Sequence, residues 1–118
     1  MNEHSEKEDA ASRPAFVMNG DGIVVGWTPE AAAIFGWSAH EATGRSLSEL
    51  IIKPSDRPSH EAGLKHFMAG ADGKFLDRPL ELSVVDREGH AIRVAFRIGV
   101  EKTTSGTRFP TTARKLDS

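Results

Sequence analysis

The sequence predicts an α+β fold in which one antiparallel sheet carries short helices on one of its faces. Two short strand-forming segments come first, several helical segments follow, and the second half of the chain is again strand-forming. Strands on both sides of a helical block are typical of a single sheet with helices packed against it. At 118 residues, the chain is expected to form one domain.

The predicted domain spans residues 14–118. Residues 1–13 are polar and charged without periodicity, so we expect a disordered or helical N-terminal lead-in. The apolar run 15–18 and the strand-forming run 23–27 flank Asn-Gly-Asp-Gly, which is a strong turn signal. These segments predict a first hairpin.

The helical block has clear start and stop signals. Thr28 is expected to cap a first helix that Gly36 ends, and Ser38 with Glu41 has the spacing of a capping box for a second. A single turn is predicted over residues 46–51. A longer helix is predicted over residues 58–70.

The second half predicts three strands. Apolar residues alternate with polar ones over 80–84 and over 92–100, which places one face inward and leaves Arg93 and Arg97 outward. The last strand, over 108–114, contains Pro110, which favours an edge position or a bulge.

Composition disfavours several classes of function. The net charge is −2, so no broad basic field favours nucleic acid, and no apolar run approaches the ~20 residues of a membrane helix. Cysteine is absent, which excludes disulfides, thiolate metal ligands and cysteine nucleophiles. No phosphate-binding loop or nucleophile-elbow motif occurs, so we do not expect an enzyme. A cytoplasmic location is the default expectation.

Three segments resemble the PAS family of sensory domains. They are DGIVVGWTPEAA at 21–32, IFGWSAHEATGR at 34–45 and REGH at 87–90, and the resemblance covers about residues 14–117. It implies a five-stranded sheet in the order 2-1-5-4-3, with short helices on one face. It also implies a sensory module that binds a small ligand or cofactor and relays a signal, with a second copy of itself and a histidine kinase or regulator as expected partners.

A cofactor-free interaction module that dimerises is the alternative function. The two functions differ in whether His60 faces an open cavity or a filled core. His60, Leu64, Phe67 and Met68 are spaced so that they share one face of the longer predicted helix.

The segment Arg57-Pro58-Ser59-His60 is similar to the R-x-x-H segment of bacterial heme-PAS oxygen sensors. That resemblance implies His60 as the ligand of the heme iron, with Leu64, Phe67 and Met68 against the porphyrin. The other interpretation is that His60 only caps or packs.

The same resemblance places the distal heme position on Leu80. Arg78 lies two residues earlier, in phase with Leu80, so an inward Arg78 would contact a heme propionate or another carboxylate. If Arg78 lies before the strand begins, it is an ordinary solvated arginine. Flavin is disfavoured because the photoactive flavin subfamily depends on a cysteine, and the cofactor is left open.

Overall fold

The computed structural model describes residues 13–116, so nearly all of the predicted N-terminal lead-in lies outside the described residues. The strands are β1 (Phe16–Asn19), β2 (Val24–Trp27), β3 (Leu80–Val85), β4 (Ala91–Ile98), β5 (Glu101–Thr103) and β6 (Gly106–Lys115). The helices are α2 (Pro29–Phe35), α3 (Ala39–Ala42), α4 (Leu47–Ile51), the 3₁₀ turn η1 (Pro54–Asp56) and α5 (Arg57–Met68).

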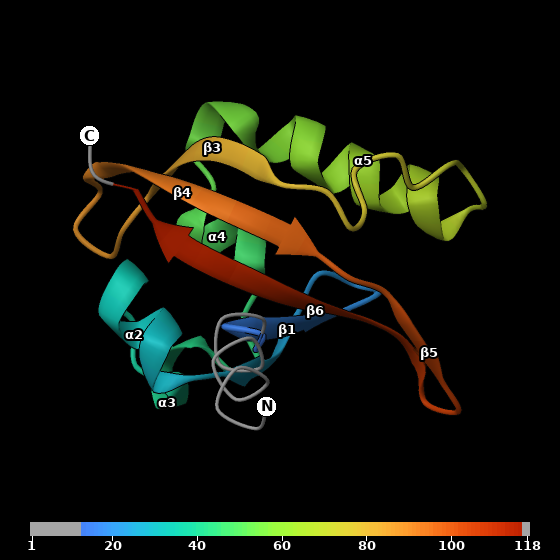
Figure 1. Ribbon diagram of the computed structural model, residues 1–118, viewed down its shortest axis with the longest axis horizontal. Coiled ribbons are helices and arrows are strands. Elements are labelled where there is room, and N and C mark those ends of the chain that lie inside the picture. Colours follow the sequence, from blue (N-terminus) through green and yellow to red (C-terminus); the bar gives the residue numbers. More distant parts are fainter. Residues whose placement is uncertain (1–12, 117–118) are drawn as a thin grey trace, which may run out of the picture.

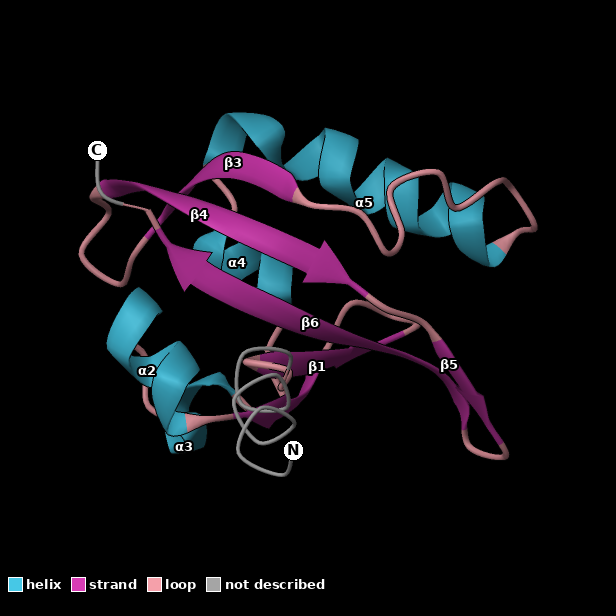
Figure 2. Cartoon of the chain, viewed as in Figure 1, coloured by secondary structure: helices cyan, strands magenta, loops and turns pink. Residues whose placement is uncertain are grey.

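The strands form one antiparallel sheet in the order β2-β1-β6-β4-β3, and the short β5 pairs with β6 (Figure 2). Counting the last strand as the fifth, this is the predicted order 2-1-5-4-3. The final strand therefore lies at the centre, between the first hairpin and the β3–β4 hairpin. The two halves of the sheet are joined through β6.

The edge position expected for Pro110 is wrong. Pro110 lies in the middle of β6, opposite Val17 of β1. On the other side of β6, β4 ends at Ile98, before the predicted end at residue 100, and β5 begins at Glu101, so the pairing along β6 is interrupted there. The carbonyl of Pro110 accepts a hydrogen bond from Gly99 in this interruption, at 2.8 Å. A residue that lacks an N–H is tolerated in a central strand because the neighbouring ladder is broken beside it.

Helices α2 and α3 begin at the capping residues that the sequence predicts. The Thr28 hydroxyl accepts from the Ala31 N–H, and Gly36 ends α2 with φ of 85°, a left-handed conformation that glycine adopts without strain. Ser38 and Glu41 form the predicted capping box at the start of α3. Both signals are local in sequence, which explains why they could be read without tertiary information.

A compact aromatic core lies between the sheet and the first helices. Phe16, Phe35 and Phe96 are buried together, with the rings of Phe35 and Phe96 stacked at 6.3 Å. In Figure 1, α4 and α5 lie behind the sheet, with α5 running alongside β3 and β4.

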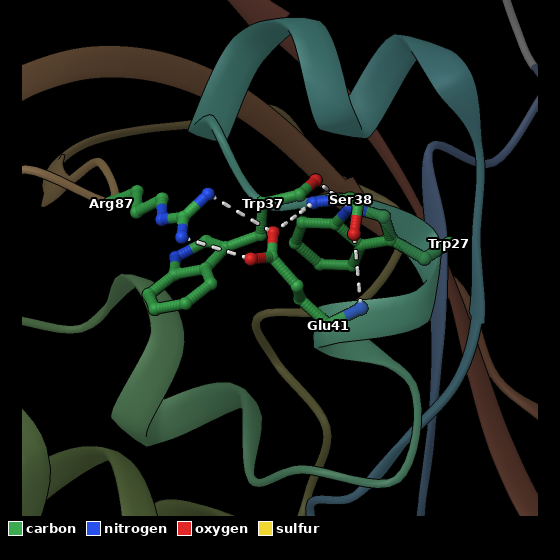
Figure 3. Close-up of polar contacts among 5 residues, drawn as sticks. All are labelled: Trp27, Trp37, Ser38, Glu41 and Arg87. Carbon is green, nitrogen blue, oxygen red and sulfur yellow. Dashed lines mark hydrogen bonds and ion pairs between the residues drawn. The ribbon is translucent and has the colours of Figure 1, made fainter.

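A polar cluster attaches α3 to the turn between β3 and β4 (Figure 3). Arg87 in that turn forms an ion pair with Glu41 at 2.9 Å, and its guanidinium lies 5.3 Å from the ring centre of Trp37. The indole N–H of Trp27 donates to the carbonyl of Trp37 at 2.8 Å. The indole N–H of Trp37 donates to the carbonyl of Leu50 in α4 at 3.2 Å. Both tryptophans therefore serve packing.

Helix α5 is held at its two ends. At its start, the Arg57 guanidinium donates to the carbonyls of Ser48 and Glu49 in α4 and of Ile52, which follows α4. At its other end, the Phe67 ring packs edge-on against Phe109 at 5.6 Å. Between these two contacts the helix packs only loosely against the rest of the domain, and none of the residues Arg57–Met68 is fully buried.

Within residues 13–116, no helix combines the length and the apolar character needed to cross a bilayer.

Candidate functional site

An apolar space of about 240 Å³ lies between α5 and the inner face of the sheet, and we call it the inner chamber. Its wall is formed by residues of α5, the loop before β3 and four strands: Met18, Ser59, His60, Gly63, Leu64, Phe75, Leu80, Leu82, Ile98 and Phe109. A smaller apolar space of about 80 Å³ adjoins it and shares Met18, His60, Leu82 and Ile98.

The exposure of Leu82 shows that side chains do not fill the space between α5 and the sheet. Leu82 and Val84 point to the same face of β3, but Val84 is 2% exposed and Leu82 is 44% exposed. Leu82 lines both apolar spaces, so its uncovered surface borders them. An inward leucine that no neighbouring side chain covers is expected in a ligand-binding space that is empty.

A second, larger space of about 560 Å³ lies on the other side of α5, and we call it the outer groove. It runs between α5, the start of α4 and the β1–β2 turn. Its wall includes Asp21, Ser48, Glu61, Lys65 and Met68, and it shares His60 and Leu64 with the inner chamber. These two shared side chains separate the groove from the chamber.

His60 is therefore the residue that borders all three spaces. Its Nδ1 atom is buried and has no hydrogen-bond partner among residues 13–116. Burial lowers the pKa of the His60 imidazole, and the nearby Glu61 carboxylate opposes this effect only in part. The imidazole is neutral at neutral pH and can bind a ligand as a hydrogen-bonding group or through a ring nitrogen.

A second buried polar atom borders the outer groove. Ser48 is 2% exposed, and its hydroxyl has no hydrogen-bond partner among the described residues. Buried polar atoms without partners are rare in native structures, since each costs about 1–3 kcal/mol. Two of them on one groove mark this place as a candidate site for a polar group.

The structure brings together some of the residues predicted for the site. His60, Leu64 and Leu80 surround the inner chamber. The Phe67 ring packs against Phe75 and Phe109 and does not line the chamber. Met68 lines the outer groove, where its methyl group lies against Gly20. The predicted stripe of α5 is therefore divided between the chamber, an aromatic anchor and the groove.

Arg78 does not point inward in the structure. It precedes β3, which begins at Leu80, and it follows Asp77, whose φ of 57° turns the chain. Arg78 is exposed and donates to the carbonyl of Lys74 at 3.2 Å. The strand alternation therefore does not extend back to this residue.

Sequence reasoning missed several residues of the site. Leu82 and Ile98 were placed on the inner face by alternation, but nothing in the pattern distinguishes a chamber wall from a filled core. Ser48 lies in a short helix without any motif, and no sequence signal identifies it.

The sequence model of the PAS fold matches residues 8–105. The chain belongs to the PAS family. PAS domains are sensory and signalling modules, and many mediate dimerisation. The match ends just before β6, although this strand holds the centre of the sheet. No curated protein matches the chain closely enough to count as a relative.

Solved PAS domains share the fold at low identity. The PAS domain of an HTR-like protein from Haloarcula marismortui is 20% identical, with 98% of this chain and 93% of that chain covered and a TM-score of 0.64. A PAS domain from Desulfitobacterium hafniense is 16% identical, with 92% and 99% covered and a TM-score of 0.70. The PAS domain of the Cronobacter turicensis quorum-sensing receptor RpfR, in complex with C12:0, is 12% identical, with 86% and 91% covered and a TM-score of 0.64.

The lowered pKa of His60 predicts a pH dependence of stability. The unfolded chain binds a proton at His60 near pH 6.5, before the folded protein does, so the free energy of unfolding should fall as the pH decreases below about 6.5. It should level off below the pKa of the folded state. Urea unfolding between pH 8 and pH 5 should show this decrease, and His60→Gln should make it smaller.

His66→Gln is the matched control, because His66 is an exposed histidine of the same helix. Its pH dependence should follow that of the wild type. Equal slopes for His60→Gln and the wild type would contradict the burial of a neutral His60.

Proposed function

We propose that this PAS domain is a sensor that binds a small, mostly apolar ligand in the inner chamber and relays its presence to a partner protein. The observation that carries the proposal is the unfilled space behind α5, which leaves the inward Leu82 44% exposed. Apolar surface without a cover is stabilised by an apolar occupant at about 25 cal/mol per Å² buried.

The size of the chamber suits a small molecule. An apolar protein cavity of roughly 150 Å³ is large enough to hold benzene. The inner chamber has about 240 Å³. The solved structure of the RpfR PAS domain in complex with C12:0 supports the proposal by analogy, because it shows a ligand bound to a domain of this fold.

The relay would start from α5. Because this helix is held by Arg57 and Phe67 at its ends and borders open space between them, an occupant of the chamber would change its position or mobility. A histidine kinase or another regulator would receive the signal, and a second copy of the domain is the expected assembly partner.

A cofactor-free dimerisation module is the competing function. It requires that side chains fill the interior around His60. The outer sheet face would then be the functional surface, but Arg93 and Arg97 on that face already bind within the chain, to Glu81 and to the carbonyl of Asp77. The open chamber beside His60 favours the ligand-binding function.

Binding of toluene to the 118-residue protein tests the proposal. In ¹H–¹⁵N NMR spectra, toluene should shift the amide signals of α5, β3 and β4 on the inner side in a saturable way. Gly63→Leu should abolish this effect, because Gly63 lines the chamber and a Cβ there meets no atom within 4 Å.

Ala62→Leu is the matched control, since Ala62 is exposed on the same helix and does not line the chamber. It adds the same side chain one position earlier and should leave toluene binding intact. The proposal fails if toluene causes no saturable shifts in the wild type, or if the two variants bind it equally.

Heme is a second candidate ligand, favoured by the unpartnered Nδ1 of His60 at the edge of the chamber. His60 would hold the iron, while Leu64 and Leu80 would contact the porphyrin. Heme would supply gas binding or redox chemistry. A porphyrin is larger than the two apolar spaces, so α5 would have to move outward.

Addition of heme to the purified protein tests this candidate. If His60 is the iron ligand, the absorption spectrum should show a sharp Soret band that is lost in His60→Ala and retained in His66→Ala. The absence of a His60-dependent band would remove heme and leave a small apolar ligand as the candidate.

A further inference from the structure

Two residues of the outer groove each carry a polar atom that is buried from solvent and has no hydrogen-bond partner among the described residues. These atoms are the hydroxyl of Ser48, in the first turn of α4, and Nδ1 of His60, in α5. Ser48 is 2% exposed, and each of these atoms has a hydrogen-bonding capacity that nothing within residues 13–116 uses. The structure therefore leaves two buried polar atoms, which line the same groove, without hydrogen bonds.

This place adjoins the inner chamber. His60 and Leu64 border both the groove and the chamber, so a molecule that extends from one space to the other passes these side chains. The chamber wall is mostly apolar, whereas Ser48 belongs to the groove and His60 lies between the two spaces. The arrangement matches a ligand with an apolar part and one polar end.

The charges around the groove disfavour an anionic end. Asp21 and Glu61 are acidic and Lys65 is basic, so the charged side chains of the groove carry a net charge of −1, which is one positive minus two negative. Ser48 is neutral, and burial lowers the pKa of His60 so that its imidazole is also neutral. A carboxylate here would meet two acidic side chains and one basic one, so the groove favours an uncharged end group.

We propose that the ligand of this domain ends in an uncharged hydrogen-bonding group such as a hydroxyl, which binds Ser48 and His60 while its apolar part occupies the inner chamber. This inference rests on the proposed function, because it names the chemical class of the same ligand. Since solvent does not reach either atom, the polar end is admitted by a small displacement of α5. Binding and the movement of this helix are therefore coupled.

The experiment compares three probes with six carbon atoms each, 1-hexanol, n-hexane and hexanoate. Their binding is measured by NMR titration of the 118-residue protein at pH 7.5. The wild type should bind 1-hexanol more tightly than hexanoate. Ser48→Ala should weaken 1-hexanol about fivefold, which corresponds to the loss of one hydrogen bond, and should leave n-hexane unchanged. Without ligand, Ser48→Ala should unfold at the same or a higher temperature, because it removes an unpartnered buried hydroxyl.

Ser83→Ala is the matched control, because Ser83 lies in β3 but lines neither the groove nor the chamber. It should change neither affinity. If n-hexane binds and Ser48→Ala leaves 1-hexanol unaffected, the polar site is wrong and the apolar chamber stands. Tighter binding of hexanoate overturns the neutral end group. If none of the probes binds, both this inference and the proposed function fail.

Discussion

The rest of the site depends on how α5 is attached. Arg57 joins the start of this helix to three carbonyl groups of α4 and its C-terminal side, and Phe67 joins its other end to Phe109 of β6. These contacts hold the helix against the sheet at its two ends, and two of the four α5 residues that line the space between them, Ser59 and Gly63, are small. Gly63 contributes no side chain at all. The inner chamber is therefore a consequence of two strong anchors and a weakly packed middle.

The same attachment connects the site to the rest of the domain. Arg57 binds carbonyls of α4, and Trp37 donates to the carbonyl of Leu50 in that helix. Trp37 also lies against Arg87, whose ion pair with Glu41 joins α3 to the β3–β4 turn. A displacement of α5 thus acts on α4, which contacts β3, and through Trp37 on the turn after β3. In the proposed sensor, this contact network would connect an occupied chamber with the surface.

Local sequence signals predicted the framework well. Thr28, Gly36 and the Ser38–Glu41 capping box set the first helices, and alternation set the inner faces of β3 and β4. Pro110 was expected at an edge or a bulge, and the edge position is wrong because the tolerance of proline in this central strand depends on an interruption in the neighbouring strand, which is a tertiary feature. The order of the sheet came from the family resemblance, since no local pattern places the last strand between the first and the fourth.

The candidate site was predictable only in part. Helical spacing placed His60 and Leu64 on the correct side of α5, but it could not show that the space before them is open. Of the two alternatives for Arg78, the structure shows the solvated one, because the strand has not yet begun at this residue. Ser48 could not be found at all, because a buried hydroxyl without a partner is visible only when all its neighbours are known.

The central claim is that the space behind α5 is an accessible apolar chamber. Diffraction from crystals of the protein held under xenon pressure tests it most directly, because xenon binds in apolar cavities and scatters strongly. The account predicts a xenon atom bounded by Leu64, Leu80, Leu82 and Phe109. A structure in which Leu82 is covered by side chains of α5 and no xenon lies behind that helix would contradict it.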